Sequence, residues 1–365
     1  MRDFAMPAKG NSTISVVVPA YQAEGTIKRC IKSAFGVGKA LLEVIVIDDG
    51  STDGTARIVG ELAADEPRIR LIRQTNRGRA AARNAGFYMT HGDWVVFLDA
   101  DDYMFPGDYG ELAAAADERH LDIVVCMHSR PGFAGLATGD IRSALLRLSA
   151  VSGSALSRAM IEGGIDALID GAQGYDFNAS WGRLYRRSLI EDVVACLGSR
   201  LAPFPTGLRF SEDRLFNLEC LWRLGDGCVG FVPFAAYYWD VNSSSTCAKV
   251  RTEDVESLKR FIGTVAELDE RFVLSSGDSR LVVAREFMEQ FKKAAKVSRG
   301  VPQLEDAWLA SFSNAWLRDN LVTFPSDSLG HRREWCLAAV LLSRGHMRAA
   351  FRVYGMLARL RQLAR

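Results

Sequence analysis

Short apolar runs alternate with segments of helical spacing along the first third of the chain. Apolar and β-branched residues predict strands at 14–18, 42–47, 69–72, 94–98 and 121–127. Between them, apolar residues recur at intervals of three and four, which predicts helices near 27–34, 53–62, 79–89 and 109–118. This alternation indicates an α/β fold, with a mostly parallel sheet flanked by helices and joined by right-handed crossovers.

The pattern changes twice in the rest of the chain. From 130 to 175 it loosens, and we interpret this stretch as an insertion over one rim of the sheet. An amphipathic helix is predicted from Glu212 to about 224, followed by strands at 229–232 and 235–239. From 255 onward the pattern is helical and includes a predicted hairpin of helices at 334–343 and 347–363. We therefore expect an α/β domain over 1–250 and a helical extension over 251–365.

Three unusual clusters follow predicted strands at their carboxyl ends. These clusters are Pro19-Ala20-Tyr21, Asp48-Asp49 and the run from Asp99 to Asp102. In parallel sheets ligands bind beyond the carboxyl ends of the strands, so the clusters predict one shared site. The three acids of the 99–102 run repel one another unless a cation is present, and a divalent cation with phosphate oxygens suits them. The alternative is a solvated acidic turn.

Composition narrows the class of protein without naming it. The formal net charge is +1, which gives no global argument for binding nucleic acid. The seven cysteines are scattered without a C-x-x-C pair, which is typical of reduced thiols in a cytoplasmic protein. Residues 1–12 contain no apolar core segment, and no apolar run approaches the ~20 residues that span a bilayer. We expect a cytoplasmic location.

Four motifs, in order, resemble one enzyme family. They are Val-Pro-Ala-Tyr (18–21), Ile-Asp-Asp-Gly-Ser-Thr-Asp-Gly-Thr (47–55), Asn-Arg-Gly with Ala-Arg-Asn-Ala-Gly (76–86) and Phe-Leu-Asp-Ala-Asp-Asp (97–102). With Glu212-Asp213 and the segment 181–190, they resemble family 2 glycosyltransferases of the GT-A fold, of the bacterial surface-polysaccharide type. The resemblance covers roughly 13–250 and implies a donor half at about 13–128 and an acceptor half at about 175–250.

The resemblance implies a reaction and a set of donor-binding residues. An inverting single displacement would move a sugar from a nucleotide diphosphate sugar, with a UDP-sugar as the expected donor and Mn²⁺ or Mg²⁺ as the cofactor. Asp101 is the expected metal ligand, and Asp99 would bind the ribose or support the metal. Asp102 is expected in a turn or capping role. The other implied nucleotide contacts are Pro19, Ala20 and Tyr21 around the base, Asp49 on uracil, and Glu24 and Arg83, for which capping and structural roles are equally open.

The acceptor side is implied by fewer residues. Asp213 is the expected general base, which takes the proton from the acceptor hydroxyl, with Glu212 as the fallback. Glu212 can equally serve as an acidic residue in the first turn of its helix. Trp181 is expected either to stack on an acceptor sugar or to lie in the core. The acceptor class implied is a lipid-linked intermediate or a saccharide.

One segment departs from the family pattern. Many relatives carry arginines in the loop after the paired tyrosines, where they could clamp the diphosphate. Here Tyr237-Tyr238-Trp239 is followed by Asp240-Val241-Asn242, none of which is basic. The sequence leaves two options: Arg186 or Arg187 supplies the clamp, or the loop closes more weakly.

The C-terminal segment is strongly basic. Residues 331–365 contain eight arginines and one acid, Glu334. Met347, Phe351, Tyr354 and Leu357 form an apolar stripe at helical spacing. Such a helix can lie peripherally on the inner face of the cytoplasmic membrane, or it can dock on the protein with a solvated basic face.

Two other function classes compete with the transferase hypothesis. A sugar nucleotidyltransferase needs a glycine-rich phosphate loop after the first strand, and Pro19-Ala20-Tyr21-Gln22 is not one. A non-catalytic scaffold of the same fold would bind nucleotide without turnover. An NAD-binding domain is disfavoured because no G-x-G-x-x-G follows the first strand.

Overall fold

The structure is a computed structural model with two compact units. It describes residues 12–131, 141–162, 165–169, 171–198, 202–240, 250–272, 276–297, 302–313, 341, 342, 344 and 346–363. The first unit comprises 1–157, 165–206 and 211–242. The second comprises 158–164, 207–210 and 243–365. Residues 158–164 and 207–210, predicted as part of the first domain, thus belong to the helical unit.

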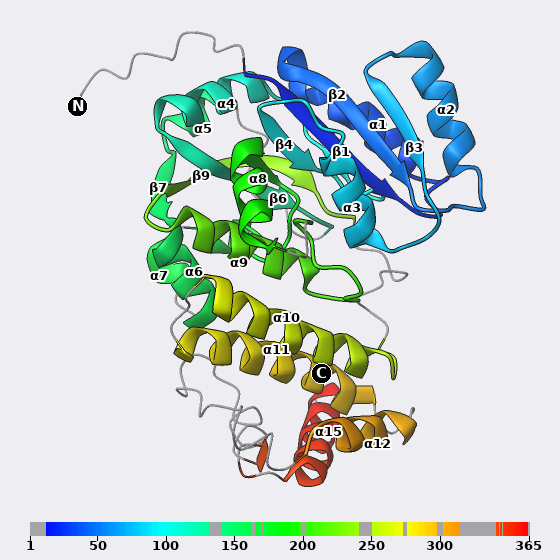
Figure 1. The fold of residues 1–365 in the computed structure, drawn as a ribbon, viewed down its shortest axis with the longest axis vertical. Coiled ribbons are helices and arrows are strands. Elements are labelled where there is room, and N and C mark those ends of the chain that lie inside the picture. The colour runs from blue at the N-terminus through cyan, green and yellow to red at the C-terminus, as the bar shows by residue number, and fades with distance from the viewer. Residues whose placement is uncertain are drawn as a thin grey trace. The chain divides into compact units, whose positions relative to one another are not determined.

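The first unit begins with the predicted alternation of strands and helices (Figure 1). Its early elements are β1 (Ile14–Ala20), α1 (Ile27–Ala34), η1 (Phe35–Ala40), β2 (Leu41–Asp48), α2 (Thr55–Asp65), β3 (Ile69–Arg73), α3 (Arg79–Phe87), β4 (Trp94–Phe97), β5 (Tyr103–Met104), α4 (Tyr109–Glu118) and β6 (Leu121–Ser129). The later ones are α5 (Ile141–Leu145), β7 (Ser149–Ser152), α6 (Gly153–Glu162), α7 (Ile165–Leu168), η2 (Ala172–Gly174), β8 (Arg183–Arg186), α8 (Arg187–Cys196), α9 (Glu212–Leu224) and β9 (Cys228–Tyr238). The residues of α6 from Arg158 onward are assigned to the second unit.

One mixed sheet forms the centre of this unit. The strand order is β3-β2-β1-β4-β8-β6-β9-β5, and β7 pairs with β9. The pairs β1–β2, β1–β4, β2–β3 and β6–β9 are parallel, whereas β8 is antiparallel to both β4 and β6. The α/β class is confirmed, and the sheet is more mixed than the alternation predicted. The reason is that β8 arrives after a long excursion, so no short helical crossover requires it to be parallel.

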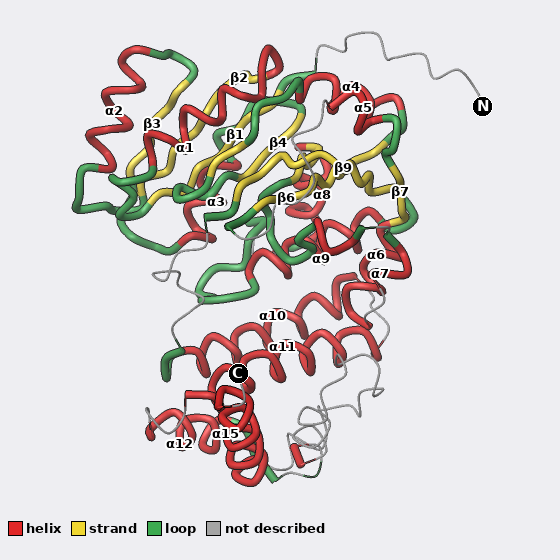
Figure 2. Tube along the Cα trace, turned by 180° about the vertical axis from the view of Figure 1, so that it is seen from behind, coloured by secondary structure: helices red, strands yellow, loops and turns green. Residues whose placement is uncertain are grey.

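Helices cover both faces of the sheet because the strands are apolar on both. Val16, Val18, Val44 and Val46 pack in one core with residues of α1, α2 and α4. Figure 2 shows these helices beside the strands of the sheet. The alternate residues Ile45 and Ile47 pack against Ala82 of α3 on the other face. This two-sided burial explains why β1 is a continuous apolar run without alternation.

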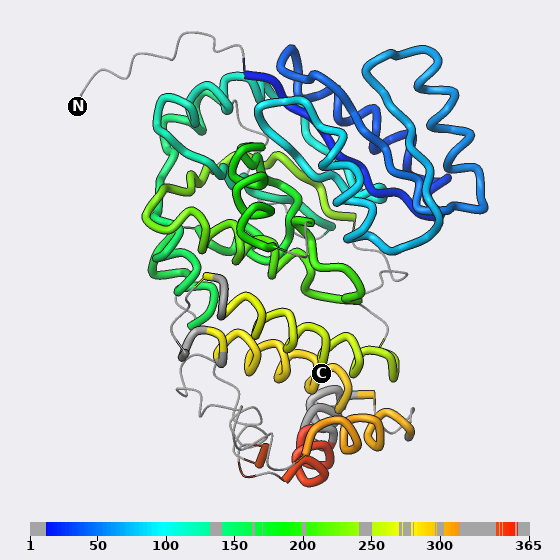
Figure 3. The backbone as a smooth tube through the Cα atoms, in the orientation of Figure 1, coloured from blue at the N-terminus to red at the C-terminus, as the bar shows by residue number. Residues whose placement is uncertain are grey.

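A single strand replaces two predicted ones near the end of this unit. Residues 229–232 and 235–239 were expected as separate strands, but β9 runs through from Cys228 to Tyr238. Its register with β6 shifts between Cys126 and Met127, opposite Val232 and Ala235. Pro233 lies in this irregularity, because proline has no N–H to donate to the ladder. Figure 3 follows the chain through α9 into β9.

The second unit is helical. Its main helices are α10 (Asp254–Phe272), α11 (Ser276–Val297), α12 (Pro302–Ser311) and α15 (Met347–Leu363). Met347, Phe351 and Tyr354 of α15 are buried in one core with Phe287, Phe291 and Trp308. Most of the stripe predicted on α15 therefore packs against protein, as in the docked-helix alternative.

Part of the predicted C-terminal hairpin lies outside the residues that the structure describes. The side chain of Leu357 and nearly all of the predicted helix at 334–343 are not described. Among the helices that the structure does describe, none combines the length and apolar character needed to cross a bilayer.

Candidate functional site

The turns after β1 and β2 are fastened to each other. Gln22, in the left-handed region at φ 51°, donates through its N–H to Ser51 Oγ at 3.0 Å and accepts the N–H of Thr52 at 2.8 Å. Glu24 accepts the N–H of Gly54, at the start of α2, at 2.8 Å. Glu24 therefore caps α2, one of its two predicted roles. Within this fixed turn the side chain of Tyr21 is half exposed to solvent.

Asp49 orders the segment that leads into α3. Its Oδ1 accepts Gln74 Nε2 at 2.7 Å and the N–H of Arg77 at 2.9 Å, and its Oδ2 accepts the N–H of Gly78 at 2.8 Å. The carboxylate is buried, and Gly78 has φ 88°, a conformation that favours glycine. Asp49 thus contacts a different set of residues from Asp99, which bonds Arg83.

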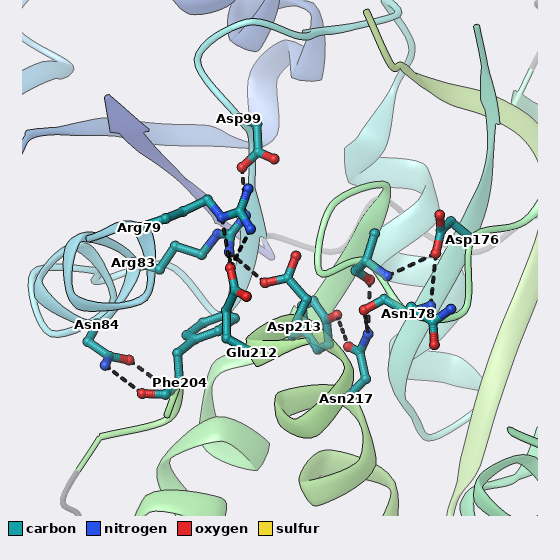
Figure 4. Close-up of polar contacts among 12 residues, drawn as sticks. Arg79, Arg83, Asn84, Asp99, Asp176, Asn178, Phe204, Glu212, Asp213 and Asn217 are labelled. Carbon is teal, nitrogen blue, oxygen red and sulfur yellow. Dashed lines mark hydrogen bonds and ion pairs between the residues drawn. The ribbon is translucent and has the colours of Figure 1, made fainter. Parts of the chain in front are cut away.

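An ionic cluster joins α3, the end of β4 and the start of α9 (Figure 4). Arg83 donates through Nη1 to Asp213 Oδ1 at 2.5 Å and through Nη2 to Asp99 Oδ1 at 2.7 Å. Arg79, one turn earlier, donates through Nε at 2.8 Å and Nη2 at 2.5 Å to Glu212 Oε1. Arg83 Nη1 also lies 3.5 Å from Glu212 Oε1. Four of these five residues were predicted from sequence, and here they form one network.

Electrostatics separate the three carboxylates of this network. Burial raises the pKa of Asp213 most strongly, Glu212 and Asp99 add to the rise, and Arg83 and Arg79 oppose it, which leaves the pKa at about 6. Burial also raises the pKa values of Asp99 and Glu212, but the two arginines outweigh it, and both pKa values are lowered. Asp213 is therefore the carboxylate that is best able to accept and release a proton near neutral pH.

Asp102 holds the end of β9 beside the acidic turn. It accepts Tyr237 Oη at 2.5 Å and the N–H of Asp240 at 2.8 Å, and the N–H of Asp99 donates to Tyr237 Oη at 3.3 Å. Burial and the charges of Asp99 and Asp101 raise the pKa of Asp102 to about 8, against the hydrogen bonds from Tyr237 and Asp240. These contacts agree with the turn role expected for Asp102.

Trp181 lies behind this turn. Its ring stacks on Tyr237 with centroids 4.4 Å apart and an interplanar angle of 7°, and the side chain is buried. Trp181 thus lies in the core in this structure, which was one of its two predicted placements. Trp181 therefore supports the wall of the site through Tyr237.

Two amide side chains position the start of α9. Asn84 donates to the carbonyl of Phe204 and accepts its N–H, both at 2.8 Å, and so holds the segment before α9 against α3. Asn217 donates to the carbonyls of Asn178 and Ala179 at 2.9 Å and accepts Tyr185 Oη at 2.6 Å. Because Asn217 lies one turn after Asp213, these bonds hold in place the helical turn that carries Asp213.

The arginines predicted as an alternative clamp lie elsewhere. Arg186 pairs with Trp94 in the sheet register and bonds Asp117 and Asp122, and the N–H of Arg187 donates to Asp93. Trp94 begins β4, whereas Asp99 follows its end, so this clamp prediction is wrong. The antiparallel direction of β8 is the physical reason.

Sequence reasoning missed Arg79, Asn84, Asn217 and Tyr237 as parts of the site. Arg79 carried a usable signal, since residues four apart share one face of a helix and Arg83 had been selected. Asn84 lies in the motif at 82–86, but neither asparagine could be linked to its partner from the sequence, because the partners lie 120 and 38 residues away along the chain.

The acidic turn fits a divalent cation of the Mg²⁺ or Mn²⁺ type. Its carboxylates are hard oxygen donors of the kind that these ions bind, and three of them fall within positions 99–102. No cluster of three or more His, Cys, Asp or Glu arranged for a metal occurs among the described residues. Such ions usually bind one or two carboxylates together with substrate phosphates, so a smaller protein donor set is suitable.

Comparisons with known proteins agree with this geometry. Residues 15–193 match the family model described as glycosyl transferase family 2. The chain is 39% identical over 118 residues to the uncharacterized glycosyltransferase YibD of Escherichia coli K12, covering 32% of this chain and 34% of YibD. It is 28% identical over 248 residues to the putative glycosyltransferase EpsH of Bacillus subtilis 168, covering 67% of this chain and 65% of EpsH. The chain thus spans less than two thirds of either relative.

A solved structure shows the same fold. TarS 1–349 of S. aureus, determined in complex with UDP-GlcNAc, superposes with a TM-score of 0.64 at 19% identity, covering 95% of this chain and 92% of that one. The first unit therefore has the GT-A fold that the motifs predicted.

Proposed function

We propose that this chain, whose residues 15–193 belong to glycosyl transferase family 2, transfers a sugar from a nucleotide diphosphate sugar to an acceptor hydroxyl. The observation that supports the proposal most directly is the bridge made by Arg83. One guanidinium holds Asp99, at the end of β4, and Asp213, at the start of α9, at 2.7 and 2.5 Å. Asp99, the acid on the donor side, and Asp213, the candidate base, thus both bond the same arginine side chain.

In the proposed step the acceptor hydroxyl oxygen attacks the anomeric carbon of the donor sugar. The bond from that carbon to the phosphate oxygen breaks, and the nucleotide diphosphate leaves with the electron pair. Asp213 takes the hydroxyl proton, which suits a carboxylate of pKa about 6. A single displacement of this kind inverts the anomeric configuration.

The donor is proposed to be a UDP-sugar. Tyr21, half exposed in a fixed turn, offers a ring on which a base can stack, and Pro19 and Ala20 form the strand end beneath it. Asp49 is proposed to contact uracil after its bonds to the segment 74–78 rearrange or through that segment's backbone. A Mn²⁺ or Mg²⁺ ion held by Asp101 and Asp99 would supply Lewis-acid stabilisation of the leaving diphosphate.

The acceptor is proposed to be a lipid-linked or saccharide hydroxyl of a bacterial surface polysaccharide, reached from the cytoplasmic side. Arg344, Arg348 and Arg352 are exposed, whereas the apolar stripe beside them is buried. Peripheral contact with an anionic membrane would therefore be electrostatic, worth about 1 kcal/mol per arginine. Sedimentation with anionic vesicles that is abolished by salt supports this contact, and binding that resists salt argues against it.

The test of the proposal is turnover. The purified chain is incubated with Mn²⁺ or Mg²⁺, a panel of UDP- and other nucleotide sugars, and saccharide or polyisoprenoid-linked acceptors. Release of nucleotide diphosphate with acceptor-dependent product, lost in Asp213→Asn, supports the transferase. Nucleotide binding without turnover of any pair favours the scaffold alternative, and pyrophosphate release from a nucleoside triphosphate favours the nucleotidyltransferase. Full activity of Asp101→Ala would contradict its metal role.

A further inference from the structure

The positions directly after the paired tyrosines carry no basic side chain for the donor diphosphate that the proposed function requires. Residues 239–248, after the paired tyrosines, contain no Lys, Arg or His, and Asp240 adds a negative charge. A leaving diphosphate gains negative charge during transfer, so a positive side chain near it is favoured. Three arginines bond residues of this site, namely Arg29, Arg79 and Arg83.

Two of these arginines are already engaged. Arg83 is fully buried and uses both terminal nitrogens on Asp213 and Asp99. Arg29 donates through Nη2 to the carbonyl of Asp101 at 2.7 Å and to Asp240 Oδ2 at 2.9 Å. Arg29 thus neutralises the acid that stands in the loop, and Arg83 holds the carboxylates together.

Arg79 differs from both. Its Nε and Nη2 converge on a single oxygen, Glu212 Oε1, and its Nη1 has no hydrogen bond to any described residue. Its side chain is 39% exposed, whereas that of Glu212 is 3% exposed. Arg79 lies one turn before Arg83 on α3, and Arg83 bonds both Asp213 and Asp99, so Arg79 belongs to the same ionic network as these two acids. A guanidinium with a free edge is the side-chain group best suited to phosphate oxygens.

Glu212 has the properties of an anchor. It is closed off from solvent, it accepts two bonds from Arg79, and a third nitrogen, Arg83 Nη1, lies 3.5 Å away. Burial raises the pKa of Glu212, but Arg79 and Arg83 lower it by more, so the net pKa is below its usual value. Glu212 therefore stays ionised and is a weak base at neutral pH. Its position in the first turn of α9, one residue before Asp213, connects the orientation of Arg79 to that of the base.

We propose that Arg79 binds the anionic phosphate oxygens of the donor in place of arginines in the loop after Tyr238, and that Glu212 is the positioning residue that directs it. This inference rests on the proposed function for the identity of its ligand. Charge-assisted hydrogen bonds to phosphate predict a loss of roughly ten- to a hundredfold in affinity when the guanidinium is removed.

The experiment measures binding of UDP and of uridine to the full chain by calorimetry, with Mg²⁺. Arg79→Gln is expected to weaken UDP roughly ten- to a hundredfold and to leave uridine unchanged, with Arg79→Lys in between. Arg57→Gln, which removes an exposed arginine paired with Glu61 on α2, is the matched control and should bind as wild type does. Thermal unfolding of each variant checks that the fold is retained.

The outcomes separate the two proposals. If the wild type binds no nucleoside diphosphate, the proposed function fails. If the wild type binds UDP and Arg79→Gln binds it equally well, or loses UDP and uridine alike, only the inference on Arg79 is overturned. A rise in acceptor KM with unchanged UDP affinity would likewise overturn it, because the phosphate contacted would then belong to the acceptor.

Glu212→Gln distinguishes positioning from base catalysis. As a positioning residue, Glu212 should lose UDP affinity when replaced, while the acid limb of the kcat–pH profile set by Asp213 persists. Loss of that limb, with UDP affinity intact, would show that Glu212 is the base and would overturn its assignment as the anchor of Arg79.

Discussion

Two ionic clusters lie at opposite ends of the parallel strands, one at their amino ends and one at their carboxyl ends. Both contain buried carboxylates and arginines, but the carboxylate pKa values shift differently. At the amino edge, Glu43 of β2 accepts Ser15 Oγ and the N–H of His91 at 2.8 Å and Arg70 Nη1 at 2.9 Å. Burial raises the pKa of Glu43, but these bonds outweigh it and the pKa is lowered. One carboxylate is satisfied there by several donors.

At the carboxyl edge the balance is reversed. Three carboxylates, Asp99, Glu212 and Asp213, share the two guanidinium groups of Arg79 and Arg83. One negative charge is in excess, and the pKa of Asp213 rises to about 6 as a result of burial and this crowding. The comparison teaches that a saturated buried carboxylate stabilises the fold, whereas an under-compensated one is prepared for proton transfer or for a cation.

The largest expected difference between the clusters is catalytic. Asp213→Asn keeps the shape of the side chain but removes the proposed proton acceptor, so kcat should fall roughly 10²- to 10⁴-fold. Nucleotide release in a steady-state assay measures it. Glu43→Gln, at the other edge, should leave kcat unchanged, and an equal loss in both variants would show that the loss reports general unfolding.

Arg83→Met tests the other side of the balance. Removing one partner of a buried ionic network leaves Asp99 and Asp213 uncompensated, which is expected to cost about 3–5 kcal/mol of the free energy of unfolding. Urea denaturation followed by circular dichroism checks this. Combining Arg83→Met with Asp213→Asn should recover part of the loss, and strictly additive effects would contradict the coupling.

Glu43→Gln should have a smaller effect on stability. The variant keeps its shape but loses charge-assisted bonds, which is expected to cost about 1–3 kcal/mol at pH 7. Because the folded-state pKa of Glu43 is lowered, its contribution is present above the unfolded pKa and is lost as the pH falls through the folded pKa. The gap between variant and wild type in thermal unfolding should therefore narrow in acid, and a constant gap would disagree.

The pH dependence of turnover should show the mildest effect. Asp213 must be ionised to accept a proton, so kcat should rise with pH through about 6 and fall about tenfold per unit well below it. The contribution of Asp213 to the free energy of unfolding changes with pH in the opposite direction to that of Glu43. The raised folded pKa favours the protonated form, so Asp213 destabilises the fold as the pH rises above its unfolded value. A kcat profile flat from pH 5 to 8 would argue against Asp213 as the base.

Much of the first unit was predictable because its signals are local. Strands β1 to β4 and helices α1 to α4 follow from apolar spacing over a few residues, and the acids at 99–102 follow from the chain beside β4. The placement of β8 between β4 and β6 was not predictable, since no crossover rule constrains a strand that returns after such a long connection.

The amino-acid sequence by itself determined the alternation of elements, the acidic turn after β4 and the match of residues 15–193 to the family model described as glycosyl transferase family 2. Only the tertiary structure decided which carboxylates share an arginine. Arg83 and Asp213 are 130 residues apart, and they meet because Asn84 and Asn217 fasten distant backbone segments around α9. Side-chain bonds of that range leave no periodic trace in the chain, because their energy depends on where the whole fold places both partners.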